Sequence, residues 1–273
     1  MEWGRVKSIM IGVFFVVNIF LLARYFQDTK TSFNIRSEVI ENTVLILESN
    51  GININPNIIP RKMQDVRVFD IINEFETPKS AADAFWSAAK DEGVDFFNPK
   101  YVLADENSFE YHAEQYEKSR ILNETDALSF SKNIIALLRL GGNIPFANTI
   151  QSNNEGYKAV FTPEFDGLKI LDCYLSFEFT ADAITIYGHN WLNGNITGGG
   201  MTQILPVTEV LLNFSTSELK QNISIDDITF GYYLGSRQGK IITVTAVPVW
   251  EIKTSDNYYF YYDAVNGDLL EQS

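Results

Sequence analysis

The residue types that could do chemistry in this chain are few and lie far apart in the sequence. There are two histidines, His112 and His189, and one cysteine, Cys173. Neither histidine belongs to an H-x-x-x-H or H-E-x-x-H pattern, in which two imidazoles bind one zinc ion from adjacent helix turns. His189 follows a predicted strand, where a catalytic loop can lie, but a capping or surface role is the simpler interpretation. Cys173 falls within a predicted strand, so we expect it to be buried and inert.

Glycine-rich segments and acidic pairs also lack the full pattern of a catalytic or binding motif. Residues 235–240 (GSRQGK) have neither the G-x-S-x-G register of a nucleophile elbow nor the spacing of a phosphate-binding loop, so a hairpin turn is expected. Residues 197–200 (TGGG) are predicted to form a flexible loop, because no strand leading straight into a helix accompanies them. Adjacent carboxylates such as Asp226 and Asp227 are expected by chance among 35 acidic residues. The sequence therefore predicts no enzyme activity, no cofactor and no metal site.

The most distinctive segment is an apolar run near the N-terminus. Residues 6–26 are almost wholly apolar, and as a helix they would measure roughly 31 Å, close to the hydrocarbon thickness of a bilayer. The alternative is a cleaved secretory signal, but no A-x-A-like cleavage site ends the run and no cysteine follows it for lipidation. We therefore predict a retained membrane helix. Arg5 and Lys7 precede it, which by the positive-inside rule places the N-terminus in the cytoplasm and the rest of the chain outside the cell.

Asn18 interrupts this apolar run with an amide side chain. In hydrocarbon an amide prefers a hydrogen-bond partner, and a neighbouring membrane helix can supply one. Two alternatives stay open for Asn18: it faces another transmembrane helix, or it faces lipid. Asn18 is thus the candidate residue for contact with a partner's membrane helix.

Composition narrows the class of protein further. The net charge is −14, and no basic patch with interleaved aromatic residues is present, which argues against binding to nucleic acid or to anionic lipid. Aromatic residues make up 14% of the chain, so the part beyond the apolar run is expected to fold. A single cysteine permits no intramolecular disulfide, which favours a bacterial surface protein over a eukaryotic ectodomain.

Hydrophobic patterns divide the chain into three parts and predict an α+β fold. Residues 1–30 form a cytoplasmic tip and membrane anchor, residues 31–150 a first extracellular α+β unit, and residues 151–273 a second, mainly antiparallel unit with a short helix. The boundary is placed at the polar, turn-rich stretch 151–156. Helices are expected at 37–48, 81–89 and 127–140 in the first unit, and at 207–212 in the second.

In the second unit the strand predictions rest on turns and alternation. Strands 157–161 and 168–174 are expected to pair across a turn at an Asp-Gly dipeptide. The β-branched segment 241–252 is a long strand, but Pro248 cannot donate to a ladder, so an edge or a bulge is expected there. Asn266-Gly267 predicts a two-residue turn for the closing hairpin, with residues 269–270 as the closing segment.

The two ends of the chain resemble a known family. Residues 1–9 (MEWGRVKSI), running into an apolar segment that ends at 18–22 (NIFLL), are similar to the start of the YycI family of two-component-system regulatory proteins. Near the C-terminus, residues 225–233 (IDDITFGYY), 247–250 (VPVW) and 261–267 (YYDAVNG) are similar to the closing region that this family shares with its relative YycH. The middle of the chain matches only loosely.

The resemblance implies a single-pass membrane protein of Gram-positive bacteria, with its folded domain outermost and without catalysis. It also implies two partners: the cell-wall-sensing histidine kinase YycG, also called WalK, and a YycH-like protein. In that family the membrane helix is thought to contact the kinase's own helices, which gives Asn18 a role. The alternative is a surface-anchored glycan-binding module or hydrolase that uses the helix only as a tether, and a structural cell-wall protein is a third possibility.

Overall fold

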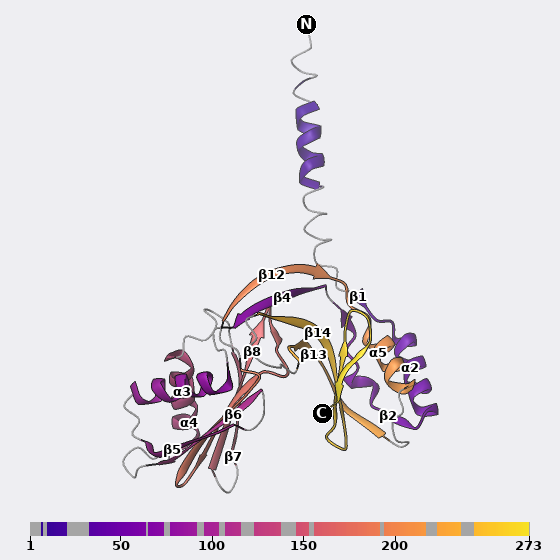
Figure 1. Ribbon diagram of the computed structural model, residues 1–273. Helices are drawn as coiled ribbons and strands as arrows, with labels where there is room; N and C mark the ends of the chain where they lie inside the picture. The colour runs from indigo at the N-terminus through magenta and orange to yellow at the C-terminus, as the bar shows by residue number, and fades with distance from the viewer. Residues whose placement is uncertain are drawn as a thin grey trace.

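Two sheets of seven strands each, with helices packed on both, build the folded part of the protein (Figure 1). The structure is a computed structural model that describes residues 7, 10–20, 33–63, 65–73, 77–91, 96–103, 107–115, 123–137, 146–152, 156–191, 194–216, 223–235 and 243–272. Pairing within both sheets is mainly antiparallel. The predicted α+β class is therefore confirmed.

The first sheet belongs to a lobe formed by the continuous segment 78–191, which we call the inserted lobe. Its strand order is β5 (Phe96–Leu103), β6 (Ser108–Gln115), β11 (Ala183–His189), β10 (Tyr174–Thr180), β8 (Gly156–Phe165) and β7 (Phe146–Ser152), with the short β9 (Leu168–Lys169) paired to β8. Helices α3 (Pro78–Asp91) and α4 (Glu124–Leu137) pack on this sheet.

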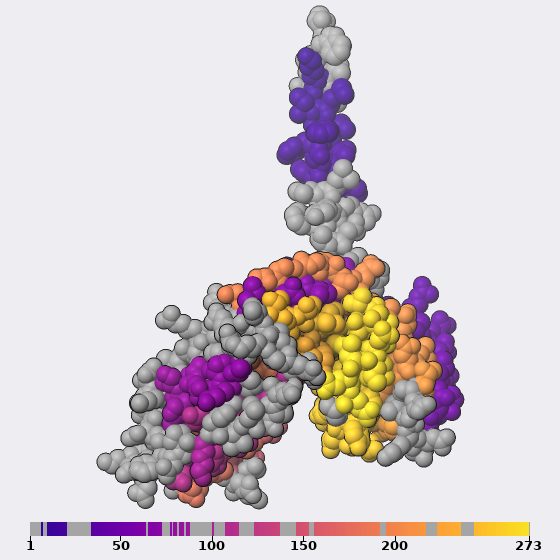
Figure 2. Space-filling view, viewed as in Figure 1, coloured from indigo at the N-terminus to yellow at the C-terminus, as the bar shows by residue number. Residues whose placement is uncertain are grey.

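The second sheet belongs to a lobe built from both flanking parts of the chain, 33–73 and 194–272, which we call the flanking lobe. Its strand order is β12 (Gly194–Thr202), β4 (Val66–Asn73), β14 (Thr243–Thr254), β13 (Ile223–Tyr233) and the parallel β2 (Ile52–Ile54), while β15 (Tyr259–Asp263) and β16 (Leu269–Gln272) extend from β14. The remaining elements are α2 (Ser37–Ser49), α5 (Val207–Thr216), the 3-10 helix η1 (Pro56–Ile58), and the pair β1 (Phe33–Asn34) and β3 (Lys62–Met63). Figure 2 shows the two lobes side by side.

The predicted boundary at residue 150 falls inside the inserted lobe rather than between two units. The polar stretch 151–156 connects β7 to β8, and these strands pair with each other from Phe146 opposite Pro163 to Ser152 opposite Tyr157. A polar, turn-rich stretch marks a hairpin as well as a linker, and local composition does not distinguish the two. The sheets instead divide the chain before α3 and after β11.

The three helices expected in the first half form where their local signals place them. In α2, the buried side chains Ile40, Val44 and Leu47 recur at helical spacing and face the core. At the start of α4, the side-chain oxygen of Asn123 accepts a hydrogen bond from the Asp126 amide at 2.9 Å, as an N-cap does. The end of the predicted 127–140 helix beyond Leu137 lies outside the described residues, and the helix expected at 207–212 is α5, which continues to Thr216.

The pairing predicted between 157–161 and 168–174 is wrong beyond the turn. Only the two residues of β9 pair back onto β8, and residues 157–161 instead pair with β10, from Tyr157 opposite Phe179 to Phe161 opposite Leu175. The chain leaves β8 because the flanking lobe holds the next residues. Ile170 bridges to Tyr232, and the Leu171 amide donates to the Tyr232 carbonyl oxygen at 2.8 Å.

Pro248 lies where β14 exchanges one neighbour for another. β13 pairs with residues 247–254 of β14, whereas β4 faces only residues 243–246 and, on the side opposite β13, β15 faces residues 249–253. The proline thus falls between the two ladders, where its missing N–H breaks no pairing on that side. The expected edge or bulge is replaced by this change of neighbour, because Pro248 stays opposite Tyr232 and its carbonyl oxygen accepts a hydrogen bond from the Ala264 amide at 2.9 Å.

One hydrophobic cluster joins the two lobes, and a second fills the flanking lobe. The shared cluster brings Phe69 of β4 against Phe165 of β8, with ring centroids 4.0 Å apart, and against Tyr232 of β13 at 4.8 Å. The second cluster surrounds Trp250 and Phe214, which are both almost fully buried. Because the lobes share a core, packing fixes their relative placement, together with the backbone contacts of Ile170 and Leu171 to Tyr232.

A helix at residues 10–20 stands apart from both lobes (Figures 1 and 2). Its large apolar side chains are 46% to 71% exposed. Within the part of the chain that the structure describes, no helix combines the length and the apolar character needed to cross a membrane. Most of the remaining residues of the predicted 6–26 segment lie outside the described ranges.

Candidate functional site

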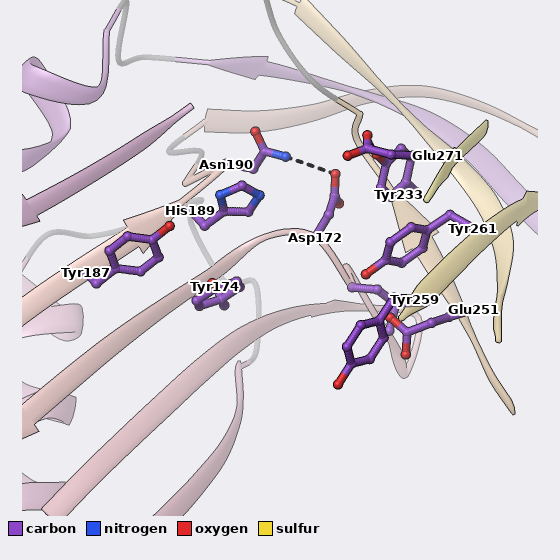
Figure 3. Close-up of a pocket in the computed structure, with 11 residues that line it drawn as sticks. Asp172, Tyr174, Tyr187, His189, Asn190, Tyr233, Glu251, Tyr259, Tyr261 and Glu271 are labelled. Atoms are coloured by element: carbon purple, nitrogen blue, oxygen red, sulfur yellow. Dashed lines mark hydrogen bonds between the residues drawn. The ribbon is translucent and has the colours of Figure 1, made fainter. Parts of the chain in front are cut away.

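A pocket of about 500 Å³ lies between the inserted lobe and the flanking lobe (Figure 3). The inserted lobe lines it with Leu171, Asp172, Tyr174, Tyr187, His189 and Asn190, and the flanking lobe with Tyr233, Glu251, Tyr259, Tyr261 and Glu271. Tyrosine rings and carboxylates therefore dominate the wall, and no lysine or arginine is among these lining residues. The volume is in the range of pockets that bind small molecules.

Asp172 holds the two lobes together at the pocket. Asp172 is 6% exposed, and its carboxylate accepts hydrogen bonds from the backbone amides of Leu234 and Gly235, at 2.9 and 2.8 Å. It also accepts one from the side-chain amide of Asn190 at 3.0 Å, drawn as a dashed line in Figure 3. Hydrogen bonds from several N–H groups satisfy a buried carboxylate, so Asp172 serves as a clamp between lobes.

Strand register builds the flanking wall of the pocket. Glu251 of β14 lies opposite Tyr261 of β15, and Tyr261 lies opposite Glu271 of β16, so the three residues form one row across neighbouring strands. The Tyr233 ring, from the end of β13, stacks on the Tyr261 ring with centroids 4.7 Å apart. The Tyr233 hydroxyl donates to the Glu271 carboxylate.

Burial sets the protonation of this wall. It raises the pKa of Tyr233, and the hydrogen bond to Glu271 raises that pKa further. Burial likewise raises the pKa of Tyr261, with the Glu251 carboxylate adding to the shift. The pKa of Glu251 is raised chiefly by burial, against the lowering effect of its hydrogen bond with Tyr261. Both tyrosines therefore stay neutral hydrogen-bond donors at physiological pH.

The opposite wall is formed by rings of the inserted lobe. Tyr174 of β10 lies opposite His189 of β11, and the centroids of their rings are 5.5 Å apart. The centroid of the Tyr174 ring is also 5.9 Å from that of the Tyr187 ring. His189 Nδ1 lies 2.7 Å from the hydroxyl oxygen of Ser108. Because Ser108 is fully buried, its hydroxyl is not accessible to a substrate, and the contact orients the imidazole ring instead. His189 is thus part of the pocket wall, where the sequence suggested a capping or surface role.

The other residues singled out in the sequence lie away from this pocket. His112 is exposed on β6, where its Nδ1 lies 2.9 Å from the Thr185 hydroxyl oxygen. Cys173 is buried, as expected, but it lies just before β10 rather than within a strand. Asp226 and Asp227 are exposed on β13 at an irregularity in its pairing. No cluster of metal-binding side chains occurs among the described residues.

The glycine-rich segment 197–200 is part of strand β12, so the prediction of a flexible loop is wrong. It forms a bulge opposite β4, with positive φ angles of 70° at Gly198 and 119° at Gly199. A β-carbon at Gly199 would lie 2.5 Å from the Arg67 side chain and 3.3 Å from a backbone oxygen. Glycine is needed here because the backbone conformation and the close approach both exclude a side chain. Of segment 235–240, only Gly235 is described.

Asn18 lies on the helix at residues 10–20, far along the chain from the pocket. Its side-chain amide donates to the Phe14 carbonyl oxygen at 2.8 Å, one helical turn earlier. The structure therefore places Asn18 on an exposed apolar helix and does not bring it together with the pocket residues.

The pocket was missed by inference from the sequence. A signal was present, because tyrosines crowd segment 257–262 (NYYFYY) and carboxylates occur at 251 and 271. Using it required the register of β14, β15 and β16, which places these residues in one row.

Tyr232 offers a test of the joint between the lobes through its ionisation. Its hydroxyl donates to the Arg67 carbonyl oxygen at 2.9 Å, and burial, assisted by Asp166, raises its pKa from 10.0 to about 12. The fold favours the neutral phenol, so this contribution to stability is complete below pH 10.0 and is lost as the pH rises towards about 12. In an alkaline titration followed by phenolate absorbance, Tyr232→Phe should remove one tyrosine's absorbance change near that pH. An unchanged titration in a folded variant would contradict the assignment.

No curated protein matches the chain. A crystal structure of an uncharacterized protein from Eubacterium rectale ATCC 33656, at 1.45 Å resolution, is similar, with a TM-score of 0.42 and 14% identity over 85% of this chain and 98% of that one. The family model described as YycI protein matches residues 30–265. Since this range covers most of the chain, the protein belongs to the YycI family, whose role is regulatory and lies in two-component systems.

Proposed function

We propose that this protein is a membrane-anchored, non-enzymatic regulator of a cell-wall-sensing histidine kinase of the YycG/WalK type, and that it acts together with a YycH-like protein. The family match over residues 30–265 carries the proposal. The chemistry of the described residues agrees with a regulator, because the one serine–histidine contact at the pocket involves a buried hydroxyl.

The N-terminal helix supplies the anchor in this proposal. The apolar side chains of residues 10–20 pack on neither lobe and are 46% to 71% exposed, and a continuous apolar surface of this kind needs an apolar environment. Arg5 and Lys7 before it favour a cytoplasmic N-terminus and an extracellular folded part. The chain then crosses the cell membrane once.

Control of the kinase would follow from contacts that differ between its two states. A regulator shifts a two-state equilibrium only by the difference in its binding free energy to those states. Asn18 is the residue of the helix best suited to such a contact, since its amide can hydrogen-bond to a neighbouring helix as well as to Phe14 of its own helix.

The test is the output of the kinase in cells carrying Asn18→Leu. Interhelical hydrogen bonds in membranes contribute on average about 0.6 kcal/mol, so expression of kinase-controlled cell-wall genes should change about two- to threefold. Val16→Leu lies on another face of the same helix and is the matched control, with no change expected. Unchanged expression in Asn18→Leu at equal protein level, and also after exchange of the whole anchor for an unrelated one, would contradict the proposal.

One observation favours a second candidate function, a surface-anchored glycan-binding module or hydrolase. The pocket combines tyrosine rings with hydroxyl, amide and carboxylate groups, and such a wall can hold a sugar by stacking and hydrogen bonding. In that case the purified chain should bind or cleave cell-wall glycan by itself, with the helix serving only as a tether.

A further inference from the structure

We infer that the pocket between the lobes binds a small organic cation carrying primary ammonium groups, of the size of a short diamine. The inference goes beyond the proposed regulatory function and does not depend on it, because it rests on the pocket wall alone. Its substance is the juxtaposition of Glu251 with the rings of Tyr259 and Tyr261 on one side, and of Tyr174 and Tyr187 on the other.

The charge of the wall favours a cation. Asp172 directs its carboxylate at two backbone amides and Asn190, so it belongs to the joint between lobes. Glu251 has a different environment, because its hydrogen-bond partner is the neutral hydroxyl of Tyr261. Lys253 and Lys169 interact electrostatically with the Glu251 carboxylate, but neither lysine lines the pocket. A half-buried carboxylate with a neutral partner attracts a cation and repels an anion.

Tyrosine rings line both sides of the pocket, with Tyr174, Tyr187 and Tyr259 half-buried, while Tyr261 is buried against Tyr233. Ammonium groups bind over tyrosine faces, and recognition of ammonium ligands by clustered aromatic rings exploits this attraction. A contact of this kind occurs beside the pocket, where the Lys253 ammonium lies 5.5 Å from the centre of the Tyr259 ring. Burial keeps Tyr261 neutral by raising its pKa, so its phenol carries no charge that a ligand would have to match.

The spacing of Glu251 and Glu271 suits a ligand with two positive charges. Glu251 and Glu271 lie on the same face, two strands apart, because each is opposite Tyr261 in the register. Neighbouring strands are about 4.8 Å apart, so the backbones of these residues are separated by about 10 Å. A flexible chain with an ammonium group at each end can place one charge at Glu251 and the other towards Glu271. A neutral sugar of the same size would leave the half-buried Glu251 charge unmatched.

The experiment is calorimetric titration of the full chain in detergent with cadaverine, a linear diamine. Pentanediol is the neutral analogue of the same shape, magnesium chloride supplies the same charge without the shape, and an N-acetylglucosamine oligomer represents a glycan. We expect saturable binding of cadaverine, with pentanediol and the oligomer bound at least about tenfold more weakly, because they lack the charge. Magnesium should not compete with cadaverine at equal concentration.

Two variants locate the binding. Glu251→Gln keeps the shape of the side chain and should weaken cadaverine binding at least about tenfold, whereas Asp182→Asn, which removes one charge from an exposed turn of the inserted lobe, should leave it unchanged. Tyr259→Leu should weaken it by about three- to thirtyfold through loss of a ring face. The inference would be overturned if pentanediol bound as tightly as cadaverine, or if magnesium competed with cadaverine. Equal effects of Glu251→Gln and Asp182→Asn on cadaverine binding would also overturn it. Binding of the N-acetylglucosamine oligomer alone would overturn it as well and would favour the glycan-binding module.

Discussion

Asp172→Ala is expected to lower the free energy of unfolding by about 3–5 kcal/mol, because it leaves several buried N–H groups without an acceptor. Those groups are the backbone amides of Leu234 and Gly235 and the side-chain amide of Asn190. Loss of these hydrogen bonds weakens the contact between residues 170–172 and the end of β13, so the two lobes should also separate more easily.

Urea unfolding of the full chain, followed by tryptophan fluorescence, measures this effect. Trp191 and Trp250 are both buried and report on the inserted and flanking lobes respectively. Asp182→Asn removes an exposed carboxylate and should change the unfolding free energy by less than about 0.5 kcal/mol. If Asp172→Ala were as mild as this control, Asp172 would not clamp the two lobes together.

Trp250→Ala is expected to have a comparable effect, with a cost of about 3–5 kcal/mol from the cavity it leaves. The Trp250 ring is 1% exposed and packs against Phe230 with centroids 4.7 Å apart, at the centre of the flanking-lobe cluster. Its indole N–H also donates to the Leu205 carbonyl oxygen at 3.1 Å, which ties β14 to the segment before α5.

Trp250→Phe separates packing from hydrogen bonding at this site. It keeps an aromatic ring but removes the indole donor, so the loss should be about 1–3 kcal/mol, smaller than that of the alanine variant. The same urea experiment gives both values. Equal destabilisation by Trp250→Phe and Trp250→Ala would show that the contact with Leu205, and not the filled volume, dominates.

Local signals were sufficient to predict the helices and the position of the closing hairpin, although residues 264–268 form a longer connection than the expected two-residue turn. The apolar spacing of Ile40, Val44 and Leu47 and the Asn123 cap act within one or two helical turns. At Asn266-Gly267, the Asn266 side chain accepts from the Asp268 amide at 2.9 Å, and Gly267 has a φ of 80°. Such interactions involve neighbours in sequence, so the residues themselves specify the outcome.

The arrangement of the sheets depends on contacts that composition does not encode. β4 lies between β12 and β14, although more than a hundred residues separate it from each. The insertion of residues 78–191 into the flanking lobe follows from this pairing. The polar stretch 151–156 predicts a unit boundary, but hairpin turns and linkers use the same polar residues. Only the pairing of β7 with β8 identifies it as a hairpin connection.

The pocket could not be predicted for the same physical reason. Asp172 is 62 residues from Leu234, whose backbone amide donates a hydrogen bond to it. The row of Glu251, Tyr261 and Glu271 forms only when three strands are in register. A shift of one residue in any strand would turn its side chain to the other face of the sheet. His189 is likewise placed in the pocket wall by strand register, because it lies opposite Tyr174.

Copurification tests most directly whether this protein regulates a histidine kinase through its membrane helix. The tagged full chain would be isolated from solubilised membranes of its host, alongside a chain whose anchor is replaced by an unrelated membrane helix. We predict that a histidine kinase of the YycG/WalK type and a YycH-like protein accompany the native chain, and that the exchanged anchor loses the kinase. Recovery of the native chain from membranes with neither protein, or equal recovery of the kinase with both anchors, would contradict the claim.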